Sequence, residues 1–246
     1  MYIYMKIVFN KQLARTINHP DIAQYNKTYQ STIQLYQYLN KNHLLEKNTN
    51  LMEIGCGIGA ILNYLSQMKK SIYFTGGDYR KKYLKIAKNL NSNINNLQFR
   101  YMDWYNLDKK YISKFNGIIS VHSLCCMKNL EEPINQIIKL KPNWFVIKSL
   151  FCEEEMDAFI RIVDHKTYKK KHGPDSDFNI FSLVKLKKLV EKKGYKLTYE
   201  KQFPFKKIKK SGMGRGTFTI KTDYSAFTQF SGPIHLPWYF TLCKKI

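Results

Sequence analysis

Residues 51–70, LMEIGCGIGAILNYLSQMKK, contain the most specific structural pattern in the sequence. The apolar run that ends at Ile54 predicts a short buried strand, and the spacing of apolar residues after Gly59 predicts an amphipathic helix. The glycines between them predict a tight turn, where the backbone can approach a ligand closely because no Cβ intervenes. This stretch therefore predicts a strand–turn–helix unit with a ligand site at the turn.

The rest of the chain repeats the alternation of strand and helix. Further strands are expected at residues 71–79, 97–105, 115–124, 143–151, 195–203 and 235–245, and helices at 25–41, 81–91, 131–140 and 182–193. Such alternation is typical of a mostly parallel sheet covered by helices on both faces. The sequence therefore predicts a single α/β domain over residues 1–246.

Two segments, 152–182 and 204–235, interrupt the alternation. Both follow predicted strands, at the edge of the sheet where α/β folds keep their binding crevices. We expect them to be insertions that form a lid on the substrate side. The remaining parts are then an N-terminal helical cover over residues 1–48 and a ligand-binding core over residues 49–151.

The chain is strongly basic, with a formal net charge of +23 from 41 Lys and Arg residues against 18 Asp and Glu residues. Clustered basic side chains favour nucleic acids and other anionic partners, because binding releases counterions from phosphates. All but five of the basic residues are lysines, however, and lysine is usually a hydrated surface charge rather than a bidentate phosphate ligand. The charge leaves two interpretations open, an anionic partner or a bias in composition.

The five cysteines form neither a disulfide framework nor a paired metal motif, so we expect a reducing, cytoplasmic location and no metal. No apolar run is long enough to span a membrane, and residues 1–15 lack the pattern of a secretory signal. Composition therefore argues against a secreted disulfide scaffold and against a membrane-spanning protein.

The glycine turn has the form Glu53-x-Gly55-x-Gly57-x-Gly59. Gly55, Gly57 and Ala60 also match the G-x-G-x-x-A turn of dinucleotide enzymes, so the turn alone leaves a nicotinamide oxidoreductase open. Glu53 helps to separate the two, because a carboxylate at the strand end repels a pyrophosphate and favours a cationic ammonium or sulfonium group. The turn therefore favours a cationic ligand such as S-adenosylmethionine (SAM).

Further motifs make the chain resemble the class I SAM-dependent methyltransferase family. Asp78 ends the second predicted strand, where an acidic residue can accept hydrogen bonds from ribose hydroxyls, and residues 83–87, YLKIA, resemble the helix that follows. Asp103 ends the third strand, where the family places an acidic residue near the adenine amino group, and residues 120–124, SVHSL, occupy the position beside the transferring methyl. The resemblance covers residues 25–203 and implies a Rossmann-like, mostly parallel, seven-stranded sheet.

The resemblance also implies SAM as the cofactor, S-adenosylhomocysteine (SAH) as its product, and a set of cofactor contacts. These contacts are Glu53, Gly55, Cys56, Gly57, Gly59, Asp78, Tyr79, Met102, Asp103, Trp104 and Ser120. Two positions depart from the family pattern. Asn116-Gly117 stands where an acidic residue is common, and Cys125-Cys126 stands where a histidine is frequent. Both departures leave the identity of a catalytic base open.

Methyl transfer from a sulfonium needs an aligned acceptor and the exclusion of water, and a base when the acceptor is a hydroxyl. The candidates for catalysis are His122, Tyr25, His172 and Asp175. His122 follows the fourth strand, although a histidine there can also pack beneath the cofactor. Tyr25 lies on the predicted N-terminal helix and can equally belong to the core. His172 and Asp175 lie in a turn-rich stretch whose composition ordinary loop chemistry also explains.

The candidates for substrate binding are Tyr29, Arg215 and Trp238. Arg215 stands among glycines, where it can clamp a phosphate or carboxylate or simply be exposed on a hairpin turn. Tyr29 and Trp238 offer aromatic faces for stacking, although most such side chains are buried for packing alone.

The leading interpretation is a methyltransferase that acts on an oxygen or nitrogen atom of a small-molecule, anionic acceptor. One specific candidate is a phosphorylated or nucleotide-linked precursor in the biosynthesis of a surface polysaccharide. The two predicted insertions and the basic turn at Arg215 favour this interpretation. An RNA methyltransferase is the alternative that the net charge favours, and a non-catalytic SAM-binding protein is the third. The sequence does not fix the acceptor or the oligomeric state.

Overall fold

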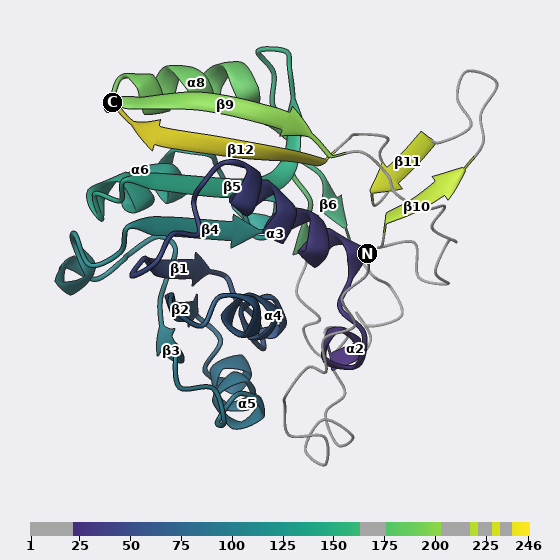
Figure 1. Ribbon diagram of the computed structural model, residues 1–246. Coiled ribbons are helices and arrows are strands. Elements are labelled where there is room, and N and C mark those ends of the chain that lie inside the picture. The colour runs from purple at the N-terminus through teal and green to yellow at the C-terminus, as the bar shows by residue number, and fades with distance from the viewer. Residues whose placement is uncertain (1–21, 163–175, 203–216, 221–227, 232–237) are drawn as a thin grey trace. The chain divides into compact units, whose positions relative to one another are not determined.

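The computed structural model describes residues 22–162, 176–202, 217–220, 228–231 and 238–246 (Figure 1). The chain forms two compact units. The first contains the residues up to Val121 together with Gln136–Phe145, and the second contains His122–Asn135 together with Val146–Ile246. No helix in the described ranges combines the length and the apolar character that crossing a membrane requires.

The main sheet has eight strands, seven of them hydrogen-bonded in the order β3-β2-β1-β4-β5-β12-β9. The strands are β1 (Asn50–Ile54), β2 (Tyr73–Asp78), β3 (Leu97–Tyr101), β4 (Gly117–Val121), β5 (Trp144–Cys152), β8 (Phe181–Ser182), β9 (Tyr195–Lys201) and β12 (Trp238–Lys245). The pairs β1–β2, β2–β3 and β1–β4 are parallel, whereas β9 and β12 are antiparallel. The predicted α/β class with a mostly parallel sheet is confirmed. The count of seven strands was one too few, because β8 pairs with β5 over two residues and is too short to show a period in the sequence.

The inner strands of the first unit, β1, β2 and β4, are largely buried, as parallel strands between covering layers must be, whereas the edge strand β3 is mostly exposed. Every residue of β1 from Leu51 to Ile54 is buried, and so is the whole of β4. The other elements of this unit are α2 (Ile22–Asn26), α3 (Gln30–Lys41), α4 (Ala60–Met68), α5 (Lys81–Leu90) and the short 3-10 helix η1 (Lys109–Tyr111). Helix α4 buries Leu62 and Leu65, the face that the apolar spacing predicts.

The single helix predicted over residues 25–41 was wrong: the structure has two helices, α2 and α3. Tyr29 caps α3 with extended backbone, at φ −68° and ψ 145°, which interrupts any helix that runs into it. Tyr25 explains why the chain turns here, because its buried hydroxyl donates a 2.6 Å hydrogen bond to Ile58 O. A tertiary contact of α2 therefore overrides the helical spacing that the sequence shows.

Gly117 begins β4 opposite Leu51 of β1, and its position leaves no room for a side chain. A Cβ built on Gly117 would lie 2.0 Å from the indole ring of Trp144. We therefore expect Gly117→Ala to lower the free energy of unfolding by about 1–3 kcal/mol, because an overpacked core must shift its neighbours. Urea denaturation followed by circular dichroism measures this loss.

The control for this prediction is the same substitution in a Trp144→Leu background, where the ring is absent. A double-mutant cycle should show the loss at Gly117 largely removed in that background. An equal loss in both backgrounds would mean that the ring contact is not the cause.

The second unit contains the remaining strands and helices. They are η2 (Leu124–Cys126), β6 (Arg161–Ile162), β7 (Ser176–Asp177), α8 (Leu183–Glu191), β10 (Thr217–Ile220) and β11 (Thr228–Ser231), while α6 (Glu131–Lys139) is shared between the units. β6 pairs with β7 inside the predicted insertion 152–182, and β10 pairs with β11 inside the predicted insertion 204–235. Each insertion thus holds a small antiparallel pair, and the predicted lid function stays a prediction.

Asn179, near the end of the predicted insertion 152–182, forms hydrogen bonds to the segment that follows β4. Its backbone N–H donates to Cys125 O at 2.6 Å, and its side-chain amide donates to Met127 O at 2.8 Å. The side-chain oxygen accepts a 3.0 Å bond from Ile160 N. One buried amide side chain therefore joins three backbone segments of the second unit.

Candidate active site

The glycine turn lies at the carboxyl end of β1. Gly55, Gly57 and Gly59 have φ angles of 78°, 55° and 82°, a region that other residues rarely adopt. The backbone N–H groups of Gly55 and Cys56 donate to Gly77 O at 2.7 and 3.0 Å, which ties the turn to the end of β2. The predicted tight turn is confirmed, with its backbone held between two strand ends.

Asp78, the last residue of β2, places a buried carboxylate beside this turn. Its Oδ2 atom accepts a 2.9 Å hydrogen bond from Gly57 N, and its Oδ1 atom accepts a 2.9 Å bond from Arg80 N. The guanidinium of Arg80 adds an ion pair, with 3.1 Å between Nε and Oδ1. A carboxylate in this position can accept hydrogen bonds from ribose hydroxyls. The sequence predicts Asp78 as a cofactor contact, and that role stays a prediction, whereas its pairing with Arg80 was not predicted.

The ends of β1 and β4 and the segment after β3 contribute further buried polar groups. Glu53 is 1% exposed and lies in register with Gly76 of β2 and Ile119 of β4. Within the part of the chain that the structure describes, Ser120 Oγ and Trp104 Nε1 are buried and have no hydrogen-bond partner. Buried polar atoms without partners cost free energy, so a ligand that supplies partners fits this place. The residues present thus fit a polar ligand such as SAM.

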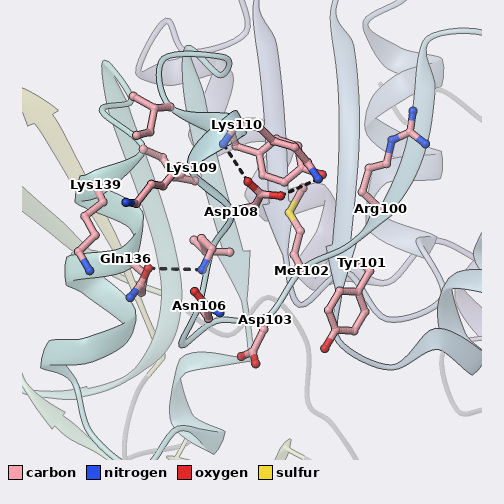
Figure 2. Close-up of a pocket in the computed structure, with 14 residues that line it drawn as sticks. Arg100, Tyr101, Met102, Asp103, Asn106, Asp108, Lys109, Lys110, Gln136 and Lys139 are labelled. Carbon is pink, nitrogen blue, oxygen red and sulfur yellow. Dashed lines mark hydrogen bonds and ion pairs between the residues drawn. The ribbon is translucent and has the colours of Figure 1, made fainter.

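A hollow of about 820 Å³ lies at the carboxyl end of β3 (Figure 2). Met102 and Asp103, both predicted cofactor contacts, line it. Asp103 is held in place because its Oδ1 atom accepts a 2.9 Å bond from Tyr105 N. Met102 packs closely on β2, since a Cβ built on Gly77 would lie 2.4 Å from the Met102 sulfur.

The walls of this hollow carry four cations that the sequence analysis did not single out. They are Arg100, Lys109, Lys110 and Lys139, which come from β3, η1 and α6 (Figure 2). Lys110 is paired with Asp108 at 2.7 Å, and Arg100 donates to Gln98 Oε1 at 2.9 Å. No sequence signal finds this group, because its members come from three separate elements and three of the four are lysines in a chain full of lysine.

His122 follows β4 directly and has an unusual backbone, with φ of 58°. Its N–H donates to Lys148 O at 2.9 Å, and its ring lies 4.4 Å from the ring of Trp238. Although part of the side chain is exposed, desolvation by the surrounding protein, followed by the charge of Lys148, holds the pKa of His122 well below its ordinary value. The imidazole is therefore neutral near pH 7, the form that accepts a proton.

Lys148 is a buried lysine of the second unit that was not singled out from the sequence. It is 1% exposed in β5, and its Nζ atom lies 5.4 Å from the centre of the Phe240 ring. Burial lowers the pKa of Lys148 to about 7. The signal was a lone lysine inside the apolar strand WFVIKSLF. Trp238, a predicted substrate contact, is 8% exposed and packs in a cluster with Leu150 and Ile180.

Tyr25 and Tyr29 lie in different environments. Tyr25 is 1% exposed, and besides its bond to Ile58 its hydroxyl accepts a 2.9 Å bond from the Asn91 side chain. These contacts support a role in bracing the glycine turn, and a catalytic role of Tyr25 stays a prediction. Tyr29 is 41% exposed at the start of α3. His172, Asp175 and Arg215 lie outside the described residues.

Comparison with known proteins agrees with this geometry. Residues 45–203 match a family model described as "Methyltransferase domain". A protein of Invertebrate iridescent virus 6 named as a methyltransferase, 235L, is 34% identical over 97 residues, which are 37% of this chain and 36% of the viral protein. The match therefore covers about a third of the length of that curated relative.

Two solved structures show the same fold at low identity. Magnesium protoporphyrin IX methyltransferase (ChlM) from Synechocystis PCC 6803, solved with bound SAH, has a TM-score of 0.54 at 13% identity, covering 94% of this chain and 89% of that one. The YcgJ protein of Bacillus subtilis has a TM-score of 0.57 at 10% identity, covering 88% of this chain and 99% of that one. The family match spans more than half of the chain, so this protein belongs to the class I SAM-dependent methyltransferases and uses SAM as its cofactor.

Proposed function

We propose that SAM binds at the carboxyl ends of β1 to β4, with the contacts that the sequence predicts. The observation that carries this proposal is the buried Asp78 carboxylate, bonded to Gly57 N of the glycine turn at 2.9 Å. Asp78 is the proposed ligand of the ribose hydroxyls, Glu53 of the cationic methionine end, and Asp103 of the adenine amino group. The other proposed contacts are Gly55, Cys56, Gly57, Gly59, Tyr79, Met102, Trp104 and Ser120.

The proposed reaction is methyl transfer to an oxygen or nitrogen atom of a small molecule. SAM supplies a methyl group already activated on a sulfonium. The protein then has to align the acceptor lone pair with that methyl carbon and exclude water. His122 is the proposed base for a hydroxyl acceptor, because its neutral imidazole would take the hydroxyl proton while the acceptor oxygen bonds to the methyl carbon and the carbon–sulfur bond of the sulfonium breaks, which would release SAH. Further proposed acceptor-side residues are Tyr25, Tyr29, His172, Asp175, Arg215 and Trp238.

The basic groups of the chain support an anionic acceptor. The hollow beside Asp103 has four cations in its wall, and the formal net charge is +23. A phosphorylated or nucleotide-linked precursor of a surface polysaccharide carries the charge that such groups favour. The five free cysteines are compatible with the reducing cytoplasm where such precursors would be methylated.

The same cations favour RNA as the second candidate acceptor. A polyanion would use many lysines at once, and its affinity would fall steeply with salt. A small anionic acceptor needs fewer contacts, so its turnover should depend less on ionic strength.

The experiment is transfer of a labelled methyl group from SAM to separated acceptor pools. We expect label in phosphorylated and sugar-nucleotide metabolites, no label in RNA, and none in any pool with an Asp78→Ala variant. Label confined to RNA, with RNA binding that persists at about 150 mM salt, would replace the small-molecule proposal by the RNA one.

A further inference from the structure

The Asp78 carboxylate is saturated with hydrogen-bond donors. Besides the backbone N–H groups of Gly57 and Arg80, it accepts 3.1 and 3.2 Å bonds from Nε and Nη2 of the Arg80 guanidinium. A carboxylate offers about four lone-pair positions, so these donors occupy all of them. Any further donor to Asp78 must therefore replace one that is already present.

Aromatic side chains hold the Arg80 guanidinium in this position. Its central carbon lies 4.1 Å from the ring centre of Tyr83 and 5.4 Å from that of Tyr79. Such cation–π contacts stabilise a cation that is partly removed from water. The Asp78 side chain is fully buried, whereas that of Arg80 is 43% exposed, so Arg80 can leave toward solvent without disturbing the core.

We propose that Arg80 occupies the ribose position of the cofactor site and must be displaced when SAM or SAH binds. This proposal rests on the assignment of Asp78 to the ribose hydroxyls. The two backbone donors to Asp78 stay, and two ribose hydroxyls replace the two guanidinium N–H donors one for one. Tyr79, a proposed cofactor contact, is uncovered by the same movement.

Displacement of Arg80 has an energetic consequence for binding. The cofactor-free protein is stabilised by the ion pair, because an isolated buried carboxylate is costly. Binding must break the guanidinium bonds, so the affinity for SAH is lower than the ribose contacts alone would give. Arg80 thereby also selects for ligands with two adjacent hydroxyls, since a ligand with fewer donors leaves part of the carboxylate unpaired.

The test is calorimetric titration of the full chain with SAH. We expect Arg80→Met to bind SAH about three- to fivefold more tightly than the wild type, the range expected for a partly exposed ion pair. The ligand-free variant should unfold at a lower temperature than the wild type. Lys88→Met is the matched control, because it removes one exposed cation from α5, the helix that follows Arg80, and leaves Asp78 and the proposed cofactor contacts untouched.

Equal or weaker binding of SAH by Arg80→Met, with the affinity of Lys88→Met equal to that of the wild type, overturns the proposal. Arg80 would then either have no effect on binding or be a direct ligand of the cofactor. Arg80→Lys serves if the Met variant does not fold. One ammonium cannot bond both oxygens as the guanidinium does, so a smaller gain in affinity is expected. An Asp78→Ala variant that retains wild-type affinity would instead show that the ribose assignment itself is wrong.

Discussion

Replacing Asp78 by alanine is expected to weaken the binding of SAH by about 100-fold or more. Hydrogen bonds to a charged group contribute roughly 1.5–3 kcal/mol each, and every 1.4 kcal/mol is about tenfold in affinity, so two ribose bonds account for this range. The substitution also removes the acceptor of the Gly57 N–H group, which helps to fix the glycine turn. Calorimetric titration with SAH measures the loss directly.

The control for this prediction is Asp108→Ala. Asp108 also accepts a backbone hydrogen bond two residues on, from Lys110 N, and pairs with a cation, yet it lies outside the proposed cofactor contacts. Wild-type affinity in Asp108→Ala and lost affinity in Asp78→Ala would localise the effect. Near-normal binding by a folded Asp78→Ala protein would contradict the ribose assignment.

A double variant, Asp78→Ala with Arg80→Met, separates two causes of weak binding. Without Asp78, the Arg80 guanidinium loses its partner and can obstruct the site. If the lost ribose bonds are the cause, the double variant stays weak. Recovery of affinity for SAH in the double variant would mean that the unpaired Arg80 guanidinium blocks the site in Asp78→Ala.

The fold around the glycine turn could be predicted from local residue patterns in the sequence. The apolar run before Gly55 and the helical spacing after Gly59 describe β1 and α4 correctly, because a buried parallel strand and an amphipathic helix each leave their own period in the sequence. The glycine turn was equally readable, since its residues have positive φ angles that other side chains rarely adopt.

The structural features that could not be predicted from the sequence depend on contacts between residues that are distant in the chain or on side-chain rotamers. The break between α2 and α3 follows from the buried bond of Tyr25 to Ile58, 33 residues away. The pairing of Arg80 with Asp78 depends on the rotamer of the arginine and on the two tyrosine rings beneath it. Neither a tertiary hydrogen bond nor a rotamer leaves a periodic trace in a single sequence.

Lys148 is a buried lysine whose protonation affects the free energy of unfolding of the protein. A lysine in the middle of β5 is shielded from water on both faces of the sheet, and burial lowers its pKa from 10.5 to about 7. Between these two values the unfolded chain binds a proton at Lys148 that the folded chain has released. Stability therefore rises with pH in this interval, by up to about 1.4 kcal/mol per pH unit for one group.

Replacing Lys148 by methionine, which is similar in length and apolar, is expected to remove this dependence. The free energy of unfolding of Lys148→Met should exceed that of the wild type by up to about 4 kcal/mol at pH 7, and the difference should shrink by about 2 kcal/mol by pH 9. Urea denaturation at pH 7, 8 and 9 measures both quantities, with Lys193→Met as the control at an exposed lysine of the same unit. A constant difference across this pH range would mean that Lys148 stays charged in the folded protein, and an anionic partner would then have to lie close to its ammonium group.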